Sequence, residues 1–193
     1  ALVRVTEIGV GPIKRALDMG AHGVVLPLVR GRGDVEAGFA HGRYPPLGRR
    51  GVGGERSVKW GLGFDEYLAC ANEELLIIPL IETREAVEDI DAILAVPGLE
   101  AIFFGPADLS ASYGHLGAWE GPSVAERILA VTAKARARGI AAGVVGRSQA
   151  DMDLRRRQGF QMIAHGSECG LLIRALGASI EAQLGKRPVH LWF

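Results

Sequence analysis

Short apolar segments alternate regularly with helical segments along this chain, and that alternation constrains the fold more than any other feature. The apolar segments are too short for buried helices and too uniformly apolar for strands with one solvated face. Such strands are typical of a parallel sheet covered on both faces. The pattern predicts six βα units, with strands expected at residues 1–5, Gly23–Val29, Leu75–Ile81, Leu99–Phe104, Ile140–Val145 and Phe160–His165.

The intervals between these segments carry apolar side chains at helical spacing, as in Ala86, Val87, Ile90, Ile93 and Leu94. Two long stretches, residues 43–63 and 110–121, lack either pattern, and loops of such length are often functional. Gly105-Pro106-Ala107 is expected to form a turn after the fourth strand. Helices are expected near residues 12–20, 34–41, 64–74, 86–94, 122–138, 149–158 and 171–184.

Strict alternation without a linker predicts one α/β domain over residues 1–185, and the tail at 186–193 stays unassigned. Two architectures fit the pattern: an open doubly wound sheet, or part of an eight-stranded barrel. Six strands cannot close an eight-stranded barrel. The chain begins directly on a strand, so the barrel alternative implies that leading βα units are missing.

Composition argues against two classes of binding partner, nucleic acid and membrane. Twenty-two basic and 22 acidic residues give a formal net charge of zero, which disfavours a nucleic-acid binder. No apolar run approaches the roughly 20 residues needed to cross a bilayer, so no membrane partner is expected. Cys70 and Cys169 have no paired spacing, which indicates free thiols and a cytoplasmic location.

Two carboxylates follow neighbouring expected strands. Glu82 comes directly after Leu75–Ile81, and Asp108 comes after the turn that follows Leu99–Phe104. Ligand sites in parallel sheets lie beyond the carboxyl ends of the strands, so the two acids could share one hard cation, Mg²⁺ or Mn²⁺. The alternative is that each acid merely favours the positive end of a following helix.

Three further positions are candidates for binding or catalysis. Arg4 lies within an apolar strand, where its guanidinium must meet either a core acid or an anionic ligand. Asp18, near a helix end, belongs either to a polar network or to the solvated surface. The backbone N–H groups of Ala107 and Asp108, after Gly105, could seat a carboxylate.

Other polar residues give weaker signals. None of the five histidines has metal-ligand spacing, and only His165 stays a candidate, because it ends the last expected strand. Arg49 and Arg50 could meet an anionic substrate or a neighbouring subunit, or could lie in a solvated loop.

Several motifs, in order and at compatible spacing, together resemble the HpcH/HpaI aldolase family of class II pyruvate aldolases, which is related to macrophomate synthase and to citrate lyase β subunits. The resemblance extends over about residues 1–185. The motifs that carry it are Leu2-Val3-Arg4-Val5, Leu17-Asp18-Met19-Gly20-Ala21, Val25-Leu26-Pro27-Leu28-Val29, Tyr44-Pro45-Pro46-Leu47-Gly48-Arg49-Arg50-Gly51, Ile81-Glu82-Thr83-Arg84-Glu85-Ala86 and Gly105-Pro106-Ala107-Asp108-Leu109-Ser110.

The resemblance implies a (β/α)8 TIM barrel of the phosphoenolpyruvate/pyruvate type, here lacking the first two βα units. It implies metal-dependent cleavage of a 4-hydroxy-2-oxo acid to pyruvate and an aldehyde. Glu82 and Asp108 would hold Mg²⁺ or Mn²⁺, with Co²⁺ as a third option. Arg4 would stabilise the enolate, Asp18 would join the active-site hydrogen bonds, and Gly105, Ala107 and Asp108 would bind the pyruvate carboxylate.

The resemblance also implies a homo-oligomer, a hexamer in the family, with the last helix packed on a neighbour. The family's active-site histidine would precede Ala1, so no histidine of this sequence takes its role. Two alternatives stay open. One is an acyl-CoA lyase of the citrate-lyase-β type, and the other is a catalytically silent fragment that binds only metal and oxo acid.

Overall fold

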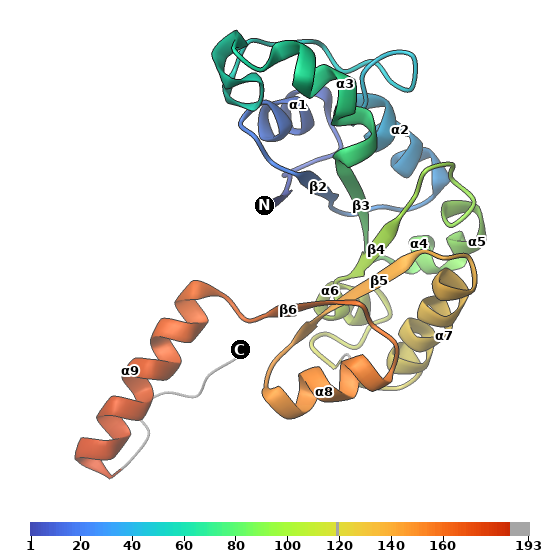
Figure 1. Cartoon of the computed structure of the whole chain (residues 1–193). Coiled ribbons are helices and arrows are strands. Elements are labelled where there is room, and N and C mark those ends of the chain that lie inside the picture. Colours follow the sequence, from blue (N-terminus) through green and yellow to red (C-terminus); the bar gives the residue numbers. More distant parts are fainter. Residues whose placement is uncertain (119, 186–193) are drawn as a thin grey trace.

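Six parallel strands form one curved sheet in the computed structural model, which describes residues 1–118 and 120–185 (Figure 1). The strands pair strictly in chain order, and each is hydrogen-bonded to the next. They are β1 (Leu2–Arg4), β2 (Gly23–Leu26), β3 (Leu76–Ile81), β4 (Ala101–Phe104), β5 (Ala141–Gly146) and β6 (Met162–His165).

Most of the helices between the strands cover the outer side of the curve, whereas the last helix extends away from the sheet (Figure 1). The helices are α1 (Val10–Asp18), α2 (Arg32–Gly42), the 3-10 helix η1 (Arg56–Gly61), α3 (Phe64–Glu74), α4 (Arg84–Glu88), α5 (Ile90–Ile93), α6 (Pro106–Ser112), α7 (Val124–Ala137), α8 (Gln149–Arg157) and α9 (Glu168–Leu184).

This topology decides between the two architectures that the sequence left open. A doubly wound sheet reverses its strand order at a switch point, and helices then cover both faces. Here the order is sequential and parallel throughout, as in a barrel. The described strands therefore form an α/β half-barrel, with β1 and β6 at its two edges.

The core lies between the outer face of the sheet and the helices. Val24, Leu26 and Ile81 point outward from their strands and are fully buried there, together with Ile13 and Leu17 of α1. Along each strand, outward and inward side chains alternate, because successive side chains of a strand point to opposite faces of the sheet. This burial against the helices fixes the register of each strand, because a slip by one residue would exchange the two faces.

The expectation of a sheet covered on both faces is wrong for the edge strands. All three residues of β1 are exposed, and none of the four residues of β6 is buried. One expected helix and one expected turn also need correction. The helix expected at 86–94 is broken at Asp89, whose carboxylate accepts a hydrogen bond of 2.8 Å from the backbone of Arg32.

The turn expected at Gly105–Ala107 is instead the start of α6, which continues to Ser112. Proline is favoured in the first turn of a helix, and Pro106 stands at that position. Among the described residues, no helix has the length and apolar character needed to cross a membrane. The unassigned tail at 186–193 lies outside the described residues.

Candidate active site

The inner face of the half-barrel borders an open cavity of about 900 Å³, which extends along the strands to their carboxyl ends. Among the residues that the structure describes, four ionisable side chains line it: Arg4, Glu82, Asp108 and Arg147. The rest of its wall is mainly apolar, which is the usual composition of a small-molecule site. The apolar part of the wall includes Leu2, Val25, Ile78, Leu80, Phe103, Val145, Met162 and Ala164.

Glu82 follows the last residue of β3 and is only 3% exposed. Its Oε1 accepts a hydrogen bond of 2.7 Å from the backbone N–H of Leu28, beyond the end of β2. The neighbouring Thr83 donates from Oγ1 to the carbonyl of Val29 at 2.6 Å, and the same oxygen caps α4. These bonds fix the Glu82 carboxylate at the edge of the cavity.

The sequence did not reveal that the backbone of Leu28 contacts the Glu82 carboxylate. Its φ of 52° lies in the left-handed region, which is unusual for a leucine, and its side chain is 59% exposed. This backbone conformation accompanies the direct hydrogen bond from the Leu28 amide to Glu82. A leucine side chain carries no signal for such a role, because the group that acts is the backbone N–H.

Gly105 makes room for the Glu82 carboxylate. A Cβ at position 105 would lie 2.7 Å from Oε2 of Glu82, closer than real contacts allow. Ala107 and Asp108, both exposed and lining the cavity, lie in the first turn of α6. Backbone N–H groups in the first turn of a helix have no acceptor within that helix. The predicted carboxylate seat is thus at a helix start rather than in a turn.

The electrostatics of Glu82 connect the predicted site residues. Burial raises the pKa of Glu82 above its ordinary value, and the carboxyl group of Asp108 raises it further. The hydrogen bond from Leu28 and the positive charge of Arg4 act in the opposite direction. The structure therefore brings Glu82, Asp108 and Arg4 together. Arg4 is exposed to the cavity rather than buried in a core.

The two carboxylates fit a divalent cation held by few protein ligands. A buried carboxylate beside a second carboxyl group is unfavourable in its charged form, and a cation between them would relieve that cost. Within residues 1–118 and 120–185, no group of three or more His, Cys, Asp or Glu could hold a metal. Water and substrate oxygens would have to complete the coordination, as is common for Mg²⁺.

Metal affinity is expected to fall steeply on acidification. The raised pKa of Glu82 means that its proton competes with the cation at a higher pH than for an ordinary glutamate. Below that pKa, each unit of pH should weaken the affinity about tenfold, and above it the affinity should level off. Calorimetric titration with Mn²⁺ from about pH 5 to pH 8 measures this. If Glu82→Gln shows the same dependence of Mn²⁺ affinity on pH as the wild-type protein, Glu82 is not the ligand that titrates.

Asp18 and Arg50 lie together, apart from the residues that line the cavity. Asp18 is 5% exposed, and its Oδ1 accepts a 2.7 Å hydrogen bond from Nη2 of Arg50. The same carboxylate pairs with Lys14. Arg50 is 2% exposed and also stacks on Tyr44, 4.5 Å from the ring centroid. Of the alternatives weighed for Asp18, the structure shows the polar network, and its catalytic role stays a prediction.

This pairing corrects the expectation of a solvated loop for Arg50, whereas Arg49 is exposed as that expectation requires. Arg50 is neither in a solvated loop nor at the cavity, because its side chain has no exposed area and binds Asp18. Arg49 is exposed and contacts Nε2 of His41 at 2.9 Å. His165, at the end of β6, is exposed and is not among the residues that line the cavity.

Comparisons with known proteins find relatives of this chain over most of its length. A profile of the HpcH/HpaI aldolase/citrate lyase family matches residues 1–175. A 4-hydroxy-2-oxovalerate aldolase of Novosphingobium aromaticivorans is 38% identical over 181 residues, which are 92% of this chain and 67% of that protein. A hydroxypyruvate/pyruvate aldolase of Chromohalobacter salexigens is 38% identical over 175 residues, which are 90% of this chain and 68% of that aldolase.

A solved structure supports the same assignment. The crystal structure of an HpcH/HpaI aldolase/citrate lyase family protein from Burkholderia cenocepacia superimposes with a TM-score of 0.89 at 32% identity. The match covers 94% of this chain and 72% of the other. The sequence profile, the aldolase relatives and the shared architecture lead to one conclusion: this chain belongs to the HpcH/HpaI aldolase/citrate lyase family.

Proposed function

We propose that this chain is the main part of a metal-dependent aldolase that cleaves a 4-hydroxy-2-oxo acid to pyruvate and an aldehyde. The observation that carries the proposal is the meeting of Glu82, Asp108 and Arg4 at one cavity. The aldolase names of its relatives support the reaction type. The chain spans about two thirds of the length of those relatives.

Each residue of the cavity has a task in this reaction. Cleavage breaks the C3–C4 bond: the 4-hydroxyl gives its proton to water and becomes the carbonyl of the aldehyde, and the electrons of the broken bond pass into the oxo group as an enolate. Arg4, whose charge already acts on Glu82, would stabilise the negative oxygen of that enolate. The amides of Ala107 and Asp108 would receive the substrate carboxylate at the start of α6. A proton added at C3 then gives pyruvate.

Glu82 and Asp108 would hold Mg²⁺, Mn²⁺ or Co²⁺, and the bound cation would supply Lewis-acid polarisation of the oxo group. The Leu28 amide keeps the Glu82 carboxylate in place for that purpose. Gly105 is required there because any larger residue would collide with the same carboxylate.

Pyruvate release is the direct test of the proposed function. With Mg²⁺ or Mn²⁺ present, the protein is expected to release pyruvate from a 4-hydroxy-2-oxo acid, followed through lactate dehydrogenase and the oxidation of NADH. A chelator should abolish the release, and added metal should restore it. Cleavage of an acyl-CoA thioester in place of this reaction would favour the citrate-lyase-β alternative. Metal binding without either turnover would favour a silent fragment.

We also propose that the chain acts as a homo-oligomer. Helix α9 extends away from the sheet (Figure 1). Many of its apolar side chains are exposed. An apolar surface of this extent is unusual on a monomer and favours cover by a second copy. The side chains concerned are Leu171, Leu172, Ile173, Leu176, Ile180 and Leu184. The two βα units expected before Ala1 and the cytoplasmic location stay predictions.

A further inference from the structure

We infer that Arg147 binds an anionic group on the aldehyde half of the substrate and so determines which oxo acids are cleaved. The inference deepens the proposed function and rests on it. Arg147 follows Gly146, the last residue of β5, and lines the same cavity as Glu82, Asp108 and Arg4. Its side chain is 49% exposed, so part of it is accessible to a ligand.

The position of Arg147 on the sheet separates it from the oxo-acid end of the substrate. Glu82 follows β3 and Asp108 follows β4, whereas Arg147 follows the next strand along, β5. A substrate whose oxo-acid end lies at Glu82 and Asp108 would extend along the inner face toward β5. Its distal end would then meet Arg147.

The wall near Arg147 is apolar. Val145 of β5 and Met162 and Ala164 of β6 line this part of the cavity. A short hydrocarbon spacer suits such a wall, and a guanidinium beyond it suits a terminal carboxylate or phosphate. We therefore expect the aldehyde half of the substrate to carry an anionic group, carboxylate or phosphate, at the end of a short aliphatic chain.

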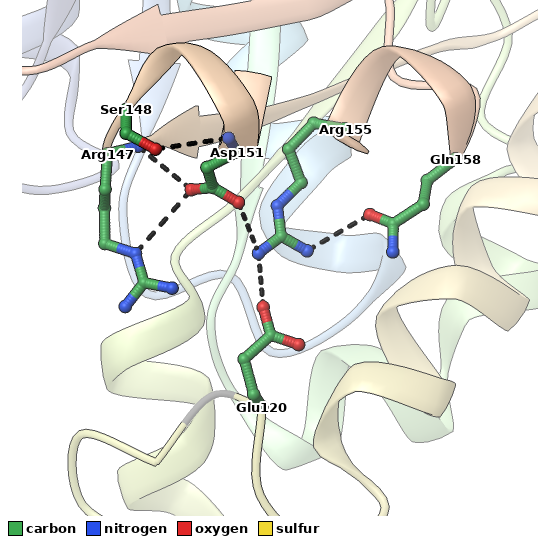
Figure 2. A network of polar contacts seen from close by, with 6 residues as sticks. All are labelled: Glu120, Arg147, Ser148, Asp151, Arg155 and Gln158. Atoms are coloured by element: carbon green, nitrogen blue, oxygen red, sulfur yellow. Dashed lines mark hydrogen bonds and ion pairs between the residues drawn. The ribbon is translucent and has the colours of Figure 1, made fainter. Parts of the chain in front are cut away.

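A network of charged side chains holds Arg147 in this position. Figure 2 shows the carboxylate of Asp151 between the side chains of Arg147 and Arg155. Asp151 Oδ2 accepts a 3.0 Å hydrogen bond from the backbone N–H of Arg147 and lies 3.6 Å from its Nε. Asp151 Oδ1 lies 3.0 Å from Nη2 of Arg155, whose side chain is only 7% exposed.

Arg155 connects Asp151 to two further side chains. It pairs with Glu120 and donates from Nη1 to Gln158 at 3.1 Å. The buried Arg155 thus fixes Asp151, and Asp151 fixes the backbone and the Nε edge of Arg147. Asp151 and Arg155 are therefore positioning residues, and Arg147 is the residue that contacts the substrate.

The test compares two ligands that differ only in a distal charge. 2-Oxoglutarate and 2-oxopentanoate share one carbon skeleton, and only the first ends in a second carboxylate. Each is titrated calorimetrically into the Mn²⁺-loaded protein, so that no turnover is needed. Wild-type protein is expected to bind 2-oxoglutarate about 10- to 100-fold more tightly, as a charge-assisted hydrogen bond allows.

Arg147→Gln should reduce that affinity ratio to about one, and Arg147→Lys should retain part of it. Asp151→Asn should lower the ratio without abolishing it, because the guanidinium is then less well held. Arg156→Gln is the matched control. Arg156 lies on the same helix α8, is exposed and pairs with Asp153 at 2.7 Å, and its loss should leave the ratio unchanged.

An equal affinity of the wild-type protein for the two ligands would overturn the inference, as would a ratio that survives Arg147→Gln. In both cases the proposed aldolase function would stand. Absence of metal-dependent binding of either ligand would instead contradict the proposed function and this inference together. Aldol synthesis from pyruvate with carboxylate-bearing, phosphate-bearing and uncharged aldehydes of matched length then identifies the anion. Equal use of all three would again overturn the role of Arg147.

Discussion

Glu82→Gln is expected to lower metal-dependent pyruvate release by about a thousandfold or more. The amide oxygen can still accept the hydrogen bond from Leu28, but the charge that would hold the cation is gone. Lewis-acid stabilisation contributes several kcal/mol to such reactions, and about 4 kcal/mol corresponds to a thousandfold change in rate. The coupled pyruvate assay and a calorimetric Mn²⁺ titration both measure the loss.

A stability measurement separates this effect from misfolding. Glu82 has a raised pKa, so its charged form is disfavoured in the metal-free protein. Between the unfolded-state pKa and the raised folded-state pKa, the folded state binds more protons, so stability falls as the pH rises. Glu82→Gln should therefore unfold in urea at the same or a higher concentration than wild type at neutral pH.

Glu88→Gln is the matched control for Glu82→Gln. Glu88 lies at the end of α4, exposed and paired with Arg84 at 2.7 Å, so its loss should leave turnover and metal binding unchanged. If Glu82→Gln keeps wild-type turnover in well-folded protein, the two-carboxylate site is not the catalytic centre.

Asp18→Ala is expected to cost about 3–5 kcal/mol of unfolding free energy, the largest stability effect predicted here. It would leave the fully buried guanidinium of Arg50 without its carboxylate partner. The hydrogen bond from Arg50 to Tyr67 at 3.1 Å and the stacking on Tyr44 would remain, but neither neutralises the charge. Equilibrium urea unfolding measures the difference.

Two comparisons make the Asp18 result interpretable. Asp153→Ala removes a partner from an exposed ion pair with Arg156, and such pairs contribute about 0–1 kcal/mol. Replacing both members, Asp18→Leu with Arg50→Met, should recover part of the lost stability because no buried charge is left unpaired. Wild-type stability combined with lost turnover in Asp18→Ala would instead support the catalytic role predicted from the sequence.

The sequence predicted the order of the elements well, because each strand and helix carries its own periodicity. The six strands and helix α3 were found where the apolar patterns placed them, with most ends shifted by a few residues. Helix α6 was missed because its seven residues are too few to show a helical repeat, although Pro106 marked its start. The break at Asp89 was missed because the apolar spacing continues across it, and the contact of the Asp89 carboxylate there, with the backbone of Arg32, lies 57 residues away.

The sequence could identify candidate site residues where a charged side chain directly follows an expected strand. Glu82 and Asp108 could be selected in this way, and their meeting follows from the parallel pairing of β3 and β4. Arg147 also follows a strand, but the sequence alone gave no reason to separate it from the many arginines of the neighbouring helix α8. Its place in the cavity became evident only from the curvature of the sheet.

The sequence by itself determined the α/β class, the strand order along the chain and the carboxylates at the strand ends, because these depend on local patterns. Only the tertiary structure decided that Arg50 is buried against Asp18, that the backbone of Leu28 holds Glu82, and that Arg147 shares their cavity. These relations join residues far apart in the chain. No local pattern encodes them, because they exist only once the sheet has curved and brought its carboxyl ends together.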